Sequence, residues 1–452
     1  MFGAAGLLCV LLLVAGCEAE RFHVNSSKTF VNLHRNFNVE YLDNAELNGF
    51  IAEDWVQWGS YRARAKFGCV THSKGRDWES ADGIVGLGFP EDYTGEHAPL
   101  PLFWALSHSP SKEGENVLPV RIFTLLLSDT AGEVVLGGFD PLSIDGKIAT
   151  IPVMPSTIVS GVPVFSHYSV NVQSLLLGGD QLLQFSQPSG GMQAILDSGT
   201  SCIVLPDDTF EGRLKDSPYG CVYNSCRTLP RFLLVLSAPL ATWLTLPNRS
   251  LFVKSLERQS QPTLTVIIGG LAIDIPYQDY IVNERTCVMK MKNSPTAFLL
   301  GDIFFKRAVV IHDMRDVQHP VVQIGKRNPQ YSVTDKLVHI GGTGASPAVK
   351  VPISKVAAPH HALEQMRRKA SNIFSQLPSV TDTEQLGDAA TSYDRTPLTS
   401  SNSFIYFAQI SAGSPPQSDI HVIVDTGSSV FAIFSVDHGG MSTIQASGYA
   451  VD

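Results

Sequence analysis

The chain has 452 residues, of which 44% are hydrophobic and 17% are charged, and its net charge is −9. This length can hold two to four domains or one large two-lobed body. The negative charge argues against nucleic acid as a partner and leaves no basic face for an anionic membrane. It is also too small to imply a disordered chain, so the composition indicates a globular protein.

Residues 1–19 form an apolar block that ends in small residues, and we interpret them as a secretory signal peptide cleaved near Ala19. The usual Lys or Arg before the apolar block is missing. The same segment could remain as a short membrane anchor, although its apolar run is short for a spanning helix. Val14-Ala15-Gly16-Cys17 also fits a lipoprotein cleavage box if the source is bacterial. The secretory interpretation predicts a secreted protein or one of a lysosome-like compartment.

The segment from about Phe22 to Arg327 has the sequence pattern of a β protein. Short apolar or alternating runs are separated by Gly, Pro, Asn and Asp, which is typical of strands joined by turns. The clearest runs are Phe37–Tyr41, Val134–Leu136, Tyr168–Leu177, Leu264–Ile275 and Val309–His312. Helical periodicity is scarce, and Pro99–Ser107 and Asp208–Leu214 are the better short candidates. We therefore predict an all-β fold with few short helices.

Five cysteines remain once the leader is set aside, and none of them has the paired spacing of a zinc site. They are Cys69, Cys202, Cys221, Cys226 and Cys287. In a secreted chain some of them should form disulfides, and we predict that Cys287 pairs with Cys221 or Cys226.

Residues 328–399 differ in composition and are predicted to be a linker and a basic region. Gly341–Pro347 is typical of a flexible spacer. A basic stretch of helical character follows at His361–Gln376. The pattern of short strand-like runs resumes after Thr399, but residues 400–452 are too few to complete a sheet domain alone.

Two segments share a pattern of three apolar residues followed by Asp, a hydroxyl residue, Gly and two more hydroxyl residues. The first carries Asp197 and the second carries Asp425. A single copy would fit an Asx-type turn after a strand, but the repeat argues against that explanation. Burial of an unpaired acid is costly, so hydroxyl donors around each acid indicate a tuned group. The predicted supporting residues are Ser198, Gly199, Thr200, Thr426, Gly427 and Ser428.

Two acids on matching turns predict a specific chemistry. If the fold holds them about 3 Å apart, they cannot both ionise and they share one proton. One carboxylate then takes a proton from water, which attacks a peptide carbonyl, while the other acid donates to the carbonyl oxygen. This chemistry requires no metal and no cofactor.

These motifs resemble those of the pepsin-like aspartic endopeptidases. Asp197–Ser201 resembles the active-site motif of the C-terminal lobe. Phe298–Asp302, in which two apolar residues precede a Gly, resembles the element that lies behind this motif, and we call it the apolar-Gly element. Asp425–Ser429 and Ala81–Pro90 resemble the corresponding pair of the N-terminal lobe. The resemblance implies a bilobal fold over residues 20–327, with lobes at about 20–150 and 151–327. It also implies that Tyr41 is the flap tyrosine over the cleft.

The same resemblance implies the partners of the protein. These are peptide or protein substrates, together with a prosegment of the chain itself, at Val349–Asp394, lying in an acidic cleft. The oligomeric state is not predicted.

The order of the motifs departs from the family. The N-terminal-lobe motif comes last, so the first lobe is incomplete at its start and residues 400–452 would partly supply it. The loop after Tyr41 also lacks the usual glycines, and Ala432 stands where the family usually has Trp.

Three hypotheses account for this order. The chain could be a permuted enzyme, since a coil of about 75 residues reaches about 50 Å. It could instead be a piece of a tandem protease array or of a wrongly assembled gene sequence, because a prosegment stands where a second zymogen would begin. Third, it could be a secreted pseudoprotease that binds peptides with an incomplete dyad.

Overall fold

The computed structural model describes residues 21–41, 45–74, 81–107, 114–129, 131–184, 191–209, 221–222, 225–226, 262–282, 285–290, 296–331, 394–401 and 405–436. The predicted signal peptide, spacer and basic helical stretch lie outside these residues.

Two large β-sheets make up most of the described structure. The thirteen strands of the first sheet are β1 (Val31–Glu40), β2 (Glu46–Trp58), β3 (Tyr61–Lys74), β4 (Gly83–Gly86), β5 (Ile122–Leu127), β6 (Ala131–Leu136), β7 (Ile144–Pro152), β22 (Ala308–Asp313), β23 (Val321–Arg327), β24 (Asp394–Ser401), β25 (Ile405–Ala412), β26 (Gln417–Asp425) and β27 (Phe431–Phe434). The ten strands of the second are β10 (Ser169–Leu177), β11 (Asp180–Gln184), β12 (Met192–Leu196), β13 (Ile203–Leu205), β14 (Cys221–Val222), β15 (Ser225–Cys226), β16 (Leu264–Ile268), β17 (Leu271–Ile275), β20 (Val288–Lys290) and β21 (Leu299–Leu300).

The remaining elements are short. Two small hairpins are formed by β8 (Thr157–Val159) with β9 (Val162–Val164) and by β18 (Ile281–Val282) with β19 (Arg285–Thr286). The described α-helices are α1 (Leu102–Leu106), α2 (Asp207–Thr209), α4 (Tyr277–Tyr280) and α5 (Asp302–Phe305), and two 3-10 turns are η1 (Val24–Ser26) and η2 (Pro141–Ser143). The predicted all-β class with few short helices is confirmed. Among the described residues, no helix is long and apolar enough to cross a membrane.

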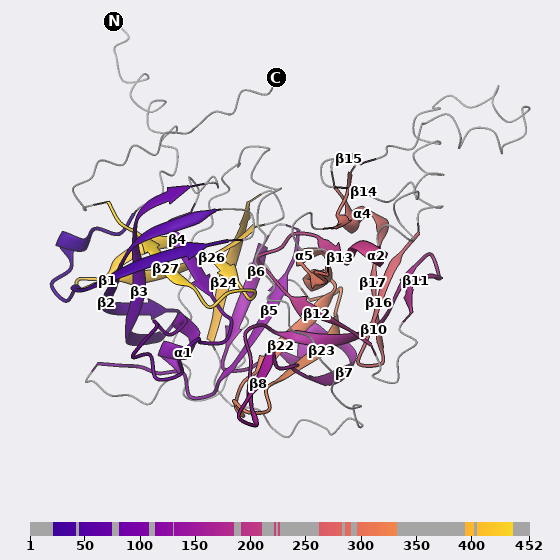
Figure 1. Ribbon diagram of the computed structural model, residues 1–452, viewed down its shortest axis with the longest axis horizontal. Helices are drawn as coiled ribbons and strands as arrows, with labels where there is room; N and C mark the ends of the chain where they lie inside the picture. The colour runs from indigo at the N-terminus through magenta and orange to yellow at the C-terminus, as the bar shows by residue number, and fades with distance from the viewer. Residues whose placement is uncertain are drawn as a thin grey trace, which may run out of the picture.

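The last four described strands lie inside the first sheet and not at its edge. The strand order is β1-β2-β3-β27-β4-β26-β25-β24-β6-β5-β22-β23-β7. In Figure 1 the yellow C-terminal strands accordingly lie among the indigo and violet strands from the start of the chain. The C-terminal segment therefore supplies the strands that the N-terminal part of this sheet lacks.

The C-terminal strands match their neighbours residue by residue. β26 runs parallel to β4, with Asp425 opposite Gly86, and β24 pairs with β6 along Asp394–Thr399. β24 thus begins within the region predicted as linker, at residues 328–399, because β6 and β25 provide a partner on each side of it. The end of β26 is a fully buried apolar run, which explains why it belongs in the interior of a sheet.

The first described residues continue from the last ones. The Phe22 N–H donates to the Phe434 carbonyl at 2.9 Å, and the Val436 N–H donates to the Phe22 carbonyl at 3.1 Å. Phe22 is fully buried in the main core, where its ring contacts Phe67. The two ends of the described chain are therefore joined by backbone pairing.

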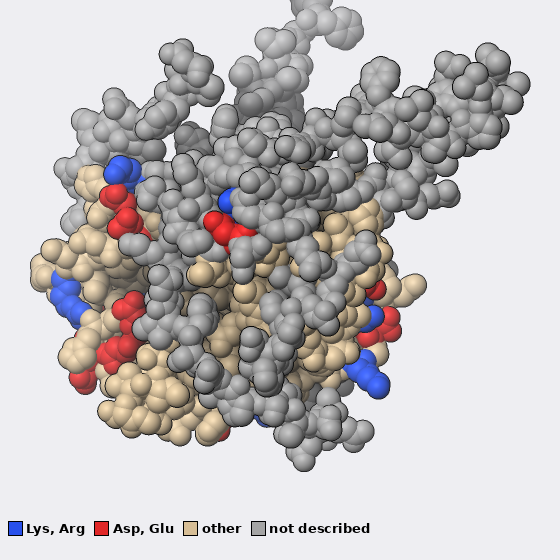
Figure 2. All heavy atoms as spheres, turned by 45° about the vertical axis from the view of Figure 1, so that its right-hand side comes forward, with Lys and Arg blue, Asp and Glu red and all other residues tan. Residues whose placement is uncertain are grey.

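One continuous apolar core extends through both sheets. Buried side chains of the first sheet, such as Phe123 and Val424, belong to the same cluster as Tyr168 and Leu196 beside and within the second sheet. Figure 2 shows acidic and basic side chains interspersed on the visible face, without a continuous field of either sign among the described residues.

Candidate active site

Asp425 lies at the end of β26, in a turn that β4 supports. β4 pairs with β26 on one side and with β27 on the other, so the strands before and after the turn flank the same strand. An ideal Cβ on Gly86 would lie 2.5 Å from the Ser428 carbonyl oxygen and 2.5 Å from Val430 N. No side chain fits there, and the glycine allows the turn to pack directly on β4.

Asp197 lies in the same setting in the second sheet. It follows β12, which pairs in parallel with β21, and β13 after the turn pairs with β21 from the other side. An ideal Cβ on Gly301 would lie 2.1 Å from the Thr200 carbonyl oxygen. The two apolar-Gly elements therefore support two equivalent turns, as expected for duplicated lobes.

The two turns face each other, and the geometry of their glycines shows how closely. An ideal Cβ on Gly199 would lie 2.5 Å from Asp425 Oδ1 and 3.2 Å from Asp197 Oδ1, so both carboxylates surround one point. An ideal Cβ on Gly427 would lie 2.3 Å from Asp197 Oδ1. Both acids are buried, at 2% exposure for Asp197 and 0% for Asp425. The structure thus brings the two predicted acids together.

Each carboxylate receives the same pair of hydrogen bonds from its own turn. Asp197 accepts from Gly199 N–H at 2.9 Å and from the Thr200 hydroxyl at 2.7 Å. Asp425 accepts from its own neighbours, and the distances are 3.0 Å for the Gly427 N–H and 2.9 Å for the Ser428 hydroxyl. These donors stabilise ionised acids and fix the planes of both carboxyl groups.

The residues that follow the two acids tie the turns to each other. The Thr426 hydroxyl accepts from Ser198 N–H at 2.9 Å and donates to the Leu196 carbonyl at 3.0 Å. The Ser198 hydroxyl accepts from Thr426 N–H at 3.1 Å and donates to the Val424 carbonyl at 3.2 Å. The four bonds form a reciprocal clamp that spans more than 200 residues of sequence.

The Thr426→Val variant should be less stable than the native protein by roughly 2–4 kcal/mol. The substitution keeps the shape but leaves the buried N–H of Ser198 and the buried carbonyl of Leu196 without the hydroxyl. Urea unfolding near neutral pH measures the change, and Thr426→Ser, which keeps the hydroxyl, is the matched control. Equal losses in the two variants would show that the hydroxyl contributes nothing.

Tyr168 connects both turns from behind and was not identified from the sequence as a site residue. Its hydroxyl donates to the Leu87 carbonyl at 2.7 Å, and Leu87 N–H donates to the Asp425 carbonyl at 2.8 Å. On the other side, the N–H of Leu196, the residue before Asp197, donates to the Tyr168 carbonyl at 3.0 Å. Tyr168 is therefore a buried link between the two acids.

Asp302 is a third acid close to the pair. Its backbone N–H donates to the Thr200 carbonyl at 2.8 Å, its side chain is fully buried, and neither carboxyl oxygen has a hydrogen-bond partner among the described residues. Burial raises the pKa of Asp302 well above its ordinary value; the positive charge of Lys306 opposes this and the negative charge of Asp197 adds to it. The Asp after the apolar-Gly element was the only sequence signal for it.

Tyr41 lies at the end of the β1–β2 hairpin, where its N–H donates to the Ala45 carbonyl at 2.8 Å. Its side chain is buried in a cluster that also contains Phe37, Ala432 and Phe434. The position at the hairpin turn suits a flap residue, and the flap role stays a prediction.

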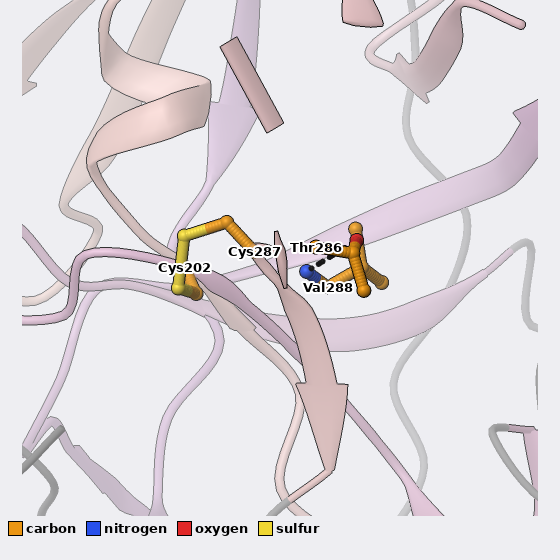
Figure 3. The surroundings of a disulfide bond; sticks show 4 residues. All are labelled: Cys202, Thr286, Cys287 and Val288. Atoms are coloured by element: carbon orange, nitrogen blue, oxygen red, sulfur yellow. Dashed lines mark hydrogen bonds between the residues drawn. A yellow bond between two sulfur atoms is a disulfide. The ribbon is translucent and has the colours of Figure 1, made fainter. Parts of the chain in front are cut away.

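The predicted disulfide pairing is wrong, because Cys287 is bonded to Cys202 and not to Cys221 or Cys226 (Figure 3). β13 and β20 run in parallel with Ile203 opposite Val288, so the residues just before them lie side by side, with Cα atoms 4.7 Å apart. The backbones of Cys221 and Cys226 instead lie opposite each other in the β14–β15 hairpin.

Within the described part of the chain, no group of three or more His, Cys, Asp or Glu side chains is arranged to bind a metal ion. What the geometry defines is a symmetric pair of buried carboxylates between two matching turns.

Such a pair is the defining feature of aspartic proteases, and comparison with known proteins agrees with this class. The family described as "Eukaryotic aspartyl protease" matches residues 11–323. The chain belongs to this family. Asp425 lies beyond the matched range.

The chain is similar to individual members at low identity. Gastricsin of Macaca fuscata fuscata is 24% identical over 314 residues, which cover 65% of this chain and 70% of that protein. Gastricsin of Homo sapiens is 23% identical over 314 residues, covering 65% and 68%. Rhizopuspepsin-3 of Rhizopus niveus is 26% identical over 306 residues, covering 66% of each. The bilobal pepsin-like fold predicted from the motifs is confirmed.

Proposed function

We propose that this chain is an aspartic endopeptidase that hydrolyses peptide bonds at acid pH, with Asp197 and Asp425 as its catalytic pair. The observation that carries the proposal is the approach of each carboxylate to the glycine of the opposite turn. That approach brings the two carboxylates to neighbouring positions between the turns, as a pair that shares a proton and binds one water molecule needs.

The proposed reaction needs one ionised and one protonated acid. The ionised carboxylate takes a proton from water as the water oxygen bonds to the carbonyl carbon, and the protonated acid gives its proton to the carbonyl oxygen. The tetrahedral intermediate then collapses: the acid that took the proton from water gives it to the amide nitrogen, the C–N bond breaks, and one hydroxyl returns a proton to the other, now ionised acid as the new carbonyl forms. The hydrogen bonds to the two acids are nearly equal, so they do not assign the two roles.

We further propose that the active chain is a permuted protease and not a fragment of an array. The four C-terminal strands fill one position each in the first sheet, and Phe22 pairs with the end of β27. The incomplete pseudoprotease is the alternative class.

The substrates are proposed to be peptides or proteins, since the family and the named relatives are proteases. The apolar leader at residues 1–19 and the Cys202–Cys287 disulfide support a secretory route, because disulfides persist in oxidising compartments. Residues 349–394 are proposed to act as the prosegment of this zymogen.

Hydrolysis of a denatured protein by the purified full chain, measured from pH 3 to pH 7, tests the function. We expect cleavage that is strongest at acid pH and is blocked by a statine-type peptide, whose hydroxyl would lie between the two acids. Binding of the inhibitor without cleavage at any pH would contradict the proposal and indicate the pseudoprotease.

A further inference from the structure

His312 on β22 is a buried titratable residue that the proposed reaction does not use. Its exposure is 0%, its ring stacks on Phe123 with centroids 4.2 Å apart and planes at 12°, and it meets the Tyr168 ring edge-on at 4.4 Å. Neither ring nitrogen has a hydrogen-bond partner among the described residues. The ring is closed off from solvent between two aromatic side chains, so the site accommodates a neutral imidazole better than an imidazolium.

Within the described part of the chain, the elements packed against His312 carry no counter-charge for it. β5 places Phe123 opposite it and β23 places Val322 opposite it. The titratable groups nearby are the phenol of Tyr168, before β10, and Asp313 on β22 itself, whose carboxylate pairs with Arg315 at 2.7 Å. Burial accordingly lowers the pKa of His312 from 6.5 to about 3, and it outweighs the backbone groups of Phe123 and Val310 beside the ring, which favour the charged form.

The position of the ring connects this residue to the active site. His312 contacts the Tyr168 side chain, whose hydroxyl donates a hydrogen bond to the Leu87 carbonyl. The Leu87 N–H in turn donates to the backbone carbonyl of Asp425. The Tyr168 backbone also holds Leu196, next to Asp197. A charge on His312 would have to be hydrated, and the water would enter the packing that keeps Tyr168 in place.

We propose that His312 is an acid-sensitive switch in the core, which opens the packing around Tyr168 when a proton from the solvent binds its ring, and so releases the two aspartate turns. It sets a lower pH limit to the folded site. The unfolded state binds one more proton than the folded state over the range in which only the unfolded histidine is charged. Stability from this residue is therefore complete above about pH 6.5 and falls towards pH 3.

The size of the effect follows from one proton. Each pH unit below about 6.5 lowers the ratio of folded to unfolded protein by about tenfold through His312 alone. Between pH 6.5 and pH 4.5 the expected change is about a hundredfold.

Urea unfolding of the full chain from pH 4.5 to pH 7.5 tests the proposal, and a readout of unfolding is independent of the proposed catalysis. The reference chain and both histidine variants carry Asp425→Asn, which prevents self-cleavage. His312→Phe should remove about a hundredfold of the stability change between pH 6.5 and pH 4.5. The control His319→Gln, at a histidine whose side chain is 79% exposed, should leave the change in place. An unchanged pH dependence in His312→Phe would overturn the proposal.

If His312→Phe does not fold, the test is made on the chain that keeps His312. Exchange of the histidine C2 proton for deuterium is followed by mass spectrometry as a function of pH. The peptide with His312 should exchange slowly and show a titration midpoint well below that of His319. Equal midpoints for the two histidines would overturn the proposal.

Discussion

Replacing Asp425 with Asn should lower kcat for peptide hydrolysis by on the order of 10²- to 10⁴-fold. Asn keeps the shape of the side chain and can still accept from the Gly427 N–H, but it cannot hold the shared proton. The variant should therefore unfold at nearly the urea concentration of the native protein while it loses activity. Initial rates on a peptide substrate at acid pH measure the effect.

Asp419→Asn is the matched control, because Asp419 lies on the same strand, β26, and is exposed. It should retain the native rate. Native activity in Asp425→Asn would show that Asp425 does not belong to the reacting pair, and the permuted-enzyme hypothesis would then be wrong.

Replacing Gly427 with Ala should lower kcat/KM by on the order of 10²-fold through a displacement of the opposite acid. The new Cβ would lie 2.3 Å from Asp197 Oδ1 and 2.5 Å from its Cγ, so the carboxylate must move. Overpacking of the buried turn should also cost about 1–3 kcal/mol of stability. Kinetics and urea unfolding of the same preparation separate the two effects.

Gly146→Ala provides the comparison. Gly146 has a φ of +84° with open space around its Cβ position, so Ala there should cost about 1–2 kcal/mol of stability through backbone strain. Its kcat/KM should stay native. If Gly427→Ala keeps native kcat/KM, the carboxylate of Asp197 has room to move without loss, and the close approach of the turns is not required for catalysis.

Much of the fold and the acid pair could be predicted from the sequence, because both depend on local patterns. Apolar runs ending in Asp, a hydroxyl residue and Gly identify a strand and a tight turn within eight residues. The repeated pattern indicated duplicated lobes, and the structure places Asp197 and Asp425 in matching turns. The family was recognisable for the same reason.

The disulfide and the buried polar residues could not be predicted, because they depend on which strands become neighbours. Cys202 meets Cys287 only because β13 and β20 pair in parallel, 85 residues apart in the chain. Asp302 and His312 look like ordinary residues at strand ends or within strands. Their burial beside Thr200 and Tyr168 arises from the packing of the two sheets.

The sequence by itself determined the class of the protein and its two candidate catalytic acids, since each acid and its hydrogen-bond donors lie within four residues. Only the tertiary structure decided that the second acid, 228 residues beyond the first, reaches the same site. The physical reason is strand pairing: β4 pairs with β26 along one edge and with β27 along the other, and this pairing carries Asp425 to Asp197.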